Sequence, residues 1–176
     1  MRNIIWFFAL ILLLVLQNGI LVPLHIISVN LVLIVVAIAT LLSEFNQGLI
    51  ITLMGGLITD FMSGLPDGVM TISFLLAFLI LHFILNEILA REANRFILGV
   101  AVLGSTLVYF FSVIFVSYIF SWFNLVTQID FMYLLSSRLP LLLLWNLIFT
   151  YPILMYYTWI QNLASRLPIY EKSIRL

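Results

Sequence analysis

The chain has 176 residues, of which 65% are hydrophobic and only 8% are charged, and its formal net charge is zero. A soluble domain is roughly half apolar and about a quarter charged. The composition therefore excludes an ordinary water-facing surface and indicates an integral membrane protein. Zero net charge gives no basis for binding nucleic acid, and the lack of cysteine excludes disulfides, thiolate catalysis and cysteine-bound metals.

Hydropathy predicts an all-α fold with one transmembrane domain, residues 1–165, followed by a polar tail, residues 166–176. Two of its six predicted spans, residues 27–42 and 49–62, are shorter than the ~20 residues of a straight crossing. Short spans suggest local thinning of the bilayer or burial among other helices. The six spans cover residues 4–21, 27–42, 49–62, 69–85, 96–120 and 139–160.

The first span, residues 4–21, begins with Arg2 and an apolar run, which is also the start of a secretory signal peptide. No small-residue cleavage site follows, so we expect a retained helix. Gln17 and Asn18 lie near its outer end. We expect their amides to hydrogen-bond a neighbouring helix or the lipid headgroups.

The third span carries a stripe of small and polar residues on one face, because helical residues four apart lie above one another. Small faces let helix backbones approach closely in lipid. We expect this face to pack inside the protein, and contact with another membrane protein is the alternative. The stripe consists of Gly48, Thr52, Gly56, Asp60 and Gly64, flanked by Gly55, Thr59 and Ser63.

Asp60 is the most informative single residue of the sequence. A charge at mid-bilayer costs about 2.5–3.5 kcal/mol on insertion scales, and the end of its own helix disfavours an anion. Asp60 therefore needs a partner, which can be the backbone amides that begin the next helix, a hydroxyl beside a protonated carboxyl, or Arg138. We expect the amides. A structural role in fixing the helix reversal is the leading interpretation, and a ligand or transport role is the alternative.

The third span ends in the cluster Gly64-Leu65-Pro66-Asp67-Gly68. Glycine permits a tight reversal, and Pro66 disfavours helix at Leu65. Asp67 or Gly68 can then serve as the N-cap of the fourth span.

Charges gather after the fourth span, where Glu87 and Arg91 have the i,i+4 spacing of a helical pair. The preference of cytoplasmic loops for basic residues explains Arg91 and Arg95. A docking surface for a cytoplasmic partner is the alternative interpretation.

Residues 124–137 form the one sizeable loop that we expect outside the membrane, with Asp130 as N-cap of a short helix, residues 131–135. Pro140 and Pro152 are expected to bend the last span. Aromatic residues and methionine suit contacts with a partner protein, although such rings also sit in the headgroup layer. This candidate partner surface comprises Trp122, Phe123, Phe131, Met132 and Tyr133.

Six spans place both termini on one side, and the positive-inside rule makes that side cytoplasmic. The outer side then holds the 64–68 turn and the 124–137 loop, and Arg138 is its only basic residue. The cytoplasmic side holds Arg2, Arg91, Arg95, Arg166, Lys172 and Arg175.

The sequence offers little for catalysis. It has no Gly-x-Ser-x-Gly motif, no phosphate-binding loop and only two histidines, His25 and His82. Two histidines without cysteine make a poor zinc site. We expect His82 to be a packing residue, and we expect neither an enzyme nor a cofactor.

The stretch MGGLITDFMSGLPDGVMTISFLLAFLI, Met54 to Ile80, resembles the central signature of the bacterial rod-shape-determining MreD family. Asn30-Leu31 resembles the family's Pro-Asn/Asp-Leu, with Val29 in place of the proline, and Asn146 and Pro152 are similar to residues of its last span. Elsewhere the resemblance is one of length, span number and hydropathy. The signature positions are Gly55, Gly56, Asp60, Ser63, Gly64 and Gly68.

The resemblance implies a non-enzymatic, multi-pass component of the cell-elongation machinery in the bacterial inner membrane. Its implied partners, besides the lipid bilayer, are the bitopic protein MreC, the glycosyltransferase RodA with a class B penicillin-binding transpeptidase, and the MreB cytoskeleton. The implied fold is similar to substrate-capture subunits of energy-coupling-factor transporters. One rival is therefore a capture subunit of a vitamin or metal importer, with an outward polar pocket and Asp60 at its floor. The second rival is an intramembrane enzyme, which requires His82 to lie beside a serine or a carboxylate.

Overall fold

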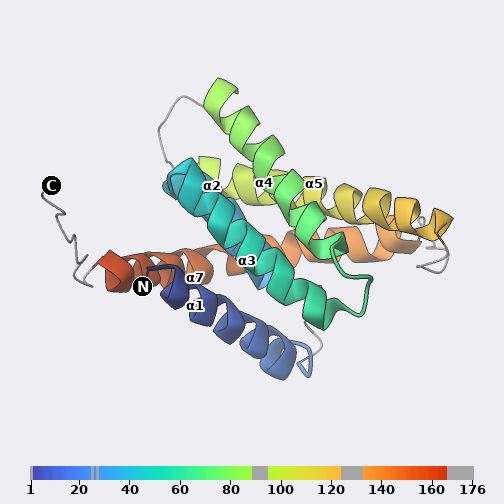
Figure 1. Cartoon of the computed structure of the whole chain (residues 1–176), viewed down its shortest axis with the longest axis horizontal. Helices are drawn as coiled ribbons and strands as arrows, with labels where there is room; N and C mark the ends of the chain where they lie inside the picture. The colour runs from blue at the N-terminus through green and yellow to red at the C-terminus, as the bar shows by residue number, and fades with distance from the viewer. Residues whose placement is uncertain (1, 25, 27, 89–94, 124–132, 166–176) are drawn as a thin grey trace, which may run out of the picture.

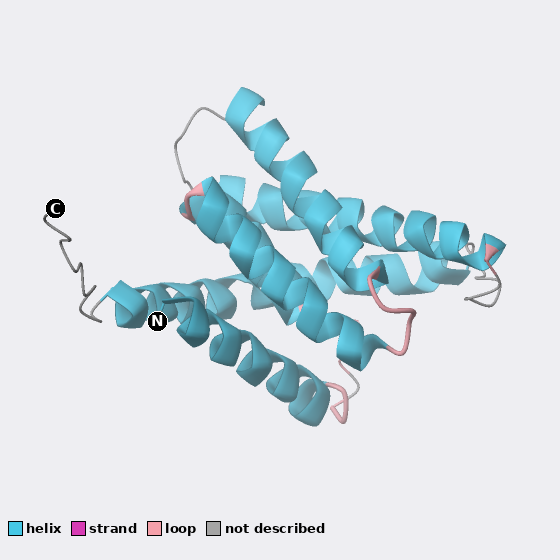
Figure 2. Ribbon diagram, in the orientation of Figure 1, coloured by secondary structure: helices cyan, strands magenta, loops and turns pink. Residues whose placement is uncertain are grey.

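The computed structural model describes residues 2–24, 26, 28–88, 95–123 and 133–165. Every regular element in these ranges is a helix, which confirms the predicted all-α class. Figure 1 shows the helices in chain order and Figure 2 their connections. The elements are α1 (Arg2–Leu16), η1 (Gln17–Leu21), α2 (Leu31–Leu42), α3 (Phe45–Ser63), α4 (Val69–Ile88), α5 (Arg95–Trp122), η2 (Leu134–Arg138) and α7 (Leu139–Ser165).

Helix α2 is the centre of the molecule. All ten residues from Leu31 to Thr40 are buried, and α2 touches α1, α3, α4, α5 and α7. A helix that is apolar on all sides must be surrounded by other helices. The shortness of this predicted span therefore reflects burial among its neighbours, which is one of the two expected explanations.

Successive helices run in opposite directions. In Figure 1 the end of α1, the α3–α4 turn and the end of α5 lie towards the right, while the start of α1 and the end of α7 lie at the left. This alternation brings η1, the α3–α4 turn and η2 to the same end of the molecule, where their polar residues can meet.

The outer faces carry large apolar side chains. Phe61 is 84% exposed and Phe83 68% exposed, and contiguous apolar patches of this kind mark contact with a membrane or a partner. Three helical stretches of the described residues are long and apolar enough to cross a membrane, and Leu31–Leu42 and Val69–Ile84 are shorter apolar helices. These results support a membrane protein. The three long stretches are Asn3–Leu21, Phe96–Trp122 and Leu134–Ala164.

The helices do not coincide with the predicted hydrophobic spans at every end. Helix α2 begins at Leu31 rather than near residue 27, because the Asn30 side chain caps it by accepting from the backbone N–H of Leu33 (3.0 Å). Helix α3 begins at Phe45, and its first turn lies outside the predicted hydrophobic span because it contains the polar residues Asn46 and Gln47. Helix α4 ends at Ile88, three residues beyond the predicted hydrophobic span.

The second part of the predicted 124–137 loop is also helical. Residues 124–132, including the proposed cap Asp130, lie outside the described residues, but Leu134–Arg138 forms the π-helical turn η2 and runs directly into α7. The backbone N–H of Leu139 bonds to the carbonyl of Leu134. Pro140 lacks an N–H and its ring would crowd the preceding turn of an α-helix, so this wide turn lets the helix pass through Pro140 without ending. Pro152 likewise lies inside α7.

Candidate functional site at the α3–α4 corner

The carboxylate of Asp60 caps helix α4. The backbone N–H of Met70 donates to Oδ1 (2.8 Å) and that of Thr71 donates to Oδ2 (3.1 Å). The Thr71 hydroxyl donates to Oδ2 as well. The expectation that Asp60 binds the amides at the start of the next helix is confirmed. The alternative pairing with Arg138 is not formed, since no ion pair occurs among the residues that the structure describes.

This arrangement explains how an acid is tolerated at a buried position. Asp60 is only 6% exposed, and both of its oxygens act as acceptors, which suits an ionised carboxylate. The N-terminus of α4 carries partial positive charge and free N–H groups, so it offsets the unfavourable end of α3. Hydrogen bonds to a charged group contribute about 1.5–3 kcal/mol each, which is enough to balance the cost of burial.

Glycine brings α3 directly against α4. A Cβ atom on Gly56 would lie 2.6 Å from the Cα atom of Thr71, and one on Gly55 would lie 2.7 Å from Cγ1 of Val32 in α2. Real Cβ atoms do not approach so closely. A side chain at position 56 would force the two helix backbones apart, whereas one at position 55 would require the Val32 side chain to shift. The prediction that the small stripe packs inside the protein is confirmed.

The turn that follows uses the expected breakers. Gly64 has φ +67° and Gly68 has φ +98°, which are left-handed conformations that favour glycine. The Ser63 hydroxyl donates to the Asp60 carbonyl (3.1 Å) and accepts from the backbone N–H of Leu65 (3.2 Å). The Gly68 carbonyl accepts the first helical bond, from Ile72 (2.9 Å). Gly68 therefore occupies the N-cap position, and the side chain that caps the helix comes from Asp60.

A second polar cluster joins α2, α5 and α7. Asn146, which is fully buried, accepts from the backbone N–H of Asn30 through Oδ1 (2.9 Å) and donates to the hydroxyl of Thr106 (3.0 Å). The Gln17 side chain accepts from the backbone N–H of Leu31 (2.9 Å). Asn30 and Asn146, which the sequence singled out separately, thus meet at the N-terminus of α2.

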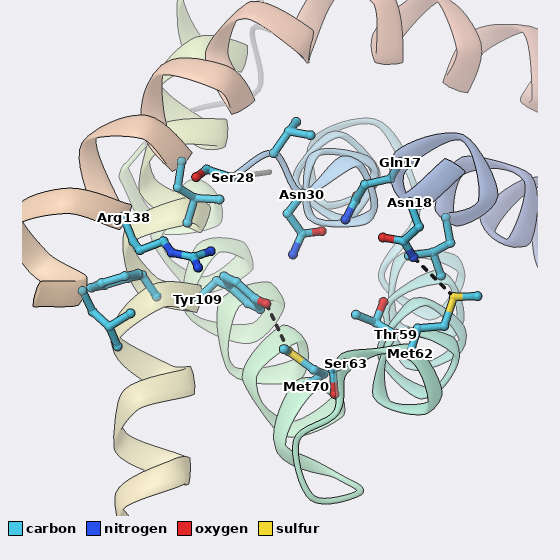
Figure 3. Close-up of a pocket in the computed structure, with 15 residues that line it drawn as sticks. Gln17, Asn18, Ser28, Asn30, Thr59, Met62, Ser63, Met70, Tyr109 and Arg138 are labelled. Atoms are coloured by element: carbon cyan, nitrogen blue, oxygen red, sulfur yellow. Dashed lines mark hydrogen bonds between the residues drawn. The ribbon is translucent and has the colours of Figure 1, made fainter. Parts of the chain in front are cut away.

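A cavity of about 390 Å³ lies between this cluster and the α3–α4 corner (Figure 3). Arg138, Tyr109, Asn18 and Ser63 reach it from four different elements. Asp60 is not among its lining residues, so this cavity is not the expected pocket with Asp60 at its floor. Sequence spacing gave no sign of this cavity, because its walls come from segments more than 100 residues apart. Its lining is Leu14, Gln17, Asn18, Ser28, Val29, Asn30, Thr59, Met62, Ser63, Met70, Tyr109, Phe110, Leu134, Arg138 and Leu142.

The candidate partner surface is described in part. Trp122 is 71%, Phe123 70% and Tyr133 56% exposed, so these rings are available for contact. Phe131, Met132 and Arg91 lie outside the described residues, and Arg95 is the first residue of α5.

The surroundings of His82 favour a packing role over a catalytic or metal-binding one. The His82 ring lies against those of Phe45 and Phe78, at centroid distances of 5.0 and 5.7 Å, which agrees with a packing role. His25 lies outside the described residues. Among the residues that are described, no three histidine or acidic side chains gather into a metal site.

Comparison with known proteins yields no match to a family model, to a curated protein or to a solved structure. Functional inference therefore depends on the residues and their geometry.

Proposed function

We propose that this chain is a non-enzymatic scaffold of the bacterial cell-elongation machinery, which regulates cell shape and peptidoglycan synthesis by holding partner proteins in the membrane. The MreD-like signature supports the proposal because its residues act as one structural unit. Asp60 caps α4, Gly56 allows contact of α3 with α4, and Gly64 and Gly68 form the turn between them. Residues engaged in internal bonds of this kind suit a scaffold better than a reaction centre.

The proposed topology has six crossings of the cytoplasmic membrane with both termini in the cytoplasm. Helix α3 has 19 residues, which extend about 28 Å at 1.5 Å per residue, close to the ~30 Å hydrocarbon core. Helix α2, with 12 residues, is too short to cross alone, but its five neighbours shield it from lipid along its length. In this topology Arg138 is the only basic residue on the outer side of the membrane.

The proposed mechanism is positional. The α3–α4 corner fixes the outer ends of these two helices, and the end of α5 lies at the same end of the molecule (Figure 1). Trp122 ends α5, Phe123 follows it and Tyr133 precedes η2, and all three rings are exposed. We infer that these rings receive the membrane helix or the adjoining segment of an MreC-type bitopic protein, through which the RodA-type glycosyltransferase, its class B transpeptidase and the MreB-type cytoskeleton are reached.

Depletion of the protein in its rod-shaped host tests this proposal. Loss of rod shape, restored by the wild-type gene but not by a gene for a variant that fails to bind the MreC-type protein, is the expected result. Normal cell shape throughout depletion would contradict it.

The cavity supports a second candidate, a substrate-capture subunit of an importer. Its volume of about 390 Å³ falls within the range of ligand sites, about 300–1,000 Å³. This candidate predicts co-purification with an ATPase module and a vitamin or metal ligand, whereas the scaffold predicts co-purification with the MreC-type protein.

A further inference from the structure

The cavity beside Arg138 has a polar wall made of hydrogen-bond donors. Gln17 and Asn30 use their side-chain oxygens to accept from the backbone N–H groups of Leu31 and Leu33. A backbone N–H can only donate, so the orientation of both amides is fixed. Their NH₂ groups are directed away from α2, on the side of the cavity (Figure 3).

Arg138 supplies the positive charge of the same cavity. Its guanidinium points inward from η2 towards Ser28 and Tyr109 (Figure 3). Among the described residues, no carboxylate lines the cavity and no ion pair engages Arg138. Because a guanidinium presents a planar fork of donors that matches phosphate or carboxylate oxygens, the cavity is complementary to an oxyanion.

The remaining wall is apolar. It includes Leu14, Met62, Phe110 and Leu142, and large apolar side chains cover the neighbouring outer surface. A free inorganic ion would leave this apolar wall in contact with water, whereas a lipid-linked anion would cover it with hydrocarbon. The volume of about 390 Å³ accommodates a headgroup, and the chains would then follow the outer apolar surface.

We propose that this cavity binds the phosphate headgroup of a membrane lipid, with Arg138 as the principal anion ligand and the amides of Gln17 and Asn30 as additional donors. The phosphate accepts hydrogen bonds from these groups, and the first methylenes of its chains contact the apolar wall. This site goes beyond the proposed scaffold function, and its test requires no partner protein.

Native mass spectrometry of the full chain in neutral detergent tests the proposal with three probes. Dioctanoyl phosphatidic acid presents the phosphate on two short chains, dioctanoylglycerol has the same chains without the phosphate, and inorganic phosphate presents the anion alone. We expect phosphatidic acid to bind at least about tenfold more tightly than dioctanoylglycerol, which is about 1.4 kcal/mol. Competition by millimolar inorganic phosphate would identify the anion as sufficient, and its failure to compete would identify the lipid-linked form as the ligand.

Arg138→Gln should reduce phosphatidic acid binding about tenfold, which is about 1.4 kcal/mol, and Arg138→Lys should lie in between because it keeps the charge without the fork. Arg166→Gln, the same change of charge in the tail, is the matched control and should bind like the wild type. Arg138 is exposed, so the variants should fold, which thermal unfolding in the same detergent verifies. Equal binding of the two lipids, or equal phosphatidic acid binding by wild type and Arg138→Gln, would overturn the proposal.

Discussion

Asp60 and Thr71 are bound to each other across the α3–α4 corner, where Gly56 lets the two helices approach closely. The carboxylate accepts both the backbone N–H and the hydroxyl of Thr71, and the Cα atom of the same threonine occupies the space that a side chain on Gly56 would need. One residue of α4 thus meets the acid and the glycine of α3, which are four positions apart in the stripe. The cap and the close packing therefore depend on each other.

Replacement of Asp60 by asparagine should lower the free energy of unfolding by about 1–3 kcal/mol, because one carboxylate oxygen becomes an NH₂ group that cannot accept from α4. Thermal unfolding of the purified protein in detergent measures the loss. Asp67→Asn is the matched control, since Asp67 is an exposed acid of the same turn, and its effect should stay within about 0.5 kcal/mol. Equal stability of the two variants would contradict the capping role.

Gly56→Ala should destabilise the protein by about 1–3 kcal/mol, because the added methyl group must push apart two helix backbones. Gly99→Ala is the control in α5, where the added Cβ atom would lie 3.8 Å from its nearest neighbour. Alanine favours helix over glycine by about 1 kcal/mol, so this control should be neutral or stabilising. A decrease in unfolding temperature of the same size for both variants, relative to the wild type, would refute the close contact.

The Asn146–Thr106 hydrogen bond should appear as energetic coupling. Asn146→Leu and Thr106→Val each leave a partner unsatisfied, at a cost of about 1–3 kcal/mol. Since the two changes remove the same bond, the double variant should lose about 0.5–1.5 kcal/mol less than the sum of the single losses. A double-mutant cycle on unfolding free energies measures this coupling, and strict additivity would show that the bond contributes nothing.

Local chemistry allowed the sequence to predict the α3–α4 corner. A small-residue stripe, a lone acid and two glycines around a proline have few arrangements that satisfy every group, so the cap by Asp60 and the turn were both foreseen. The N-terminus of α2 was less accessible to prediction. Its capping requires Gln17 from η1 and Asn146 from α7, and such distant partners leave no periodic pattern in the sequence.

The cavity and η2 were missed for related reasons. Hydropathy marks Leu134–Ser137 as the edge of a loop, whereas tertiary packing extends the helix through Pro140 by way of a π turn. From the sequence, Arg138 was considered as a partner for Asp60 and as the only basic residue of the outer side, not as part of a cavity. Its position in a cavity depends on the relative placement of seven elements, which hydrophobic periodicity does not determine.

Alanine at the exposed rings Trp122, Phe123 and Tyr133 should weaken association with the proposed MreC-type partner while changing the unfolding temperature little, because these side chains lie at the surface. Trp159→Ala is the control, since Trp159 is 59% exposed in the second half of α7. Co-purification from membranes that express both proteins measures the effect. Equal losses for the triple variant and for the control would argue against this surface.

Affinity isolation of the tagged full-length chain from cross-linked host membranes tests the proposed function most directly, because it identifies the partners without assuming them. The scaffold proposal predicts that an MreC-type bitopic protein is recovered in stoichiometric amount, together with the glycosyltransferase and transpeptidase of cell elongation. Recovery of an ATPase module of an importer, with no elongation protein above the level of an untagged control, would contradict it.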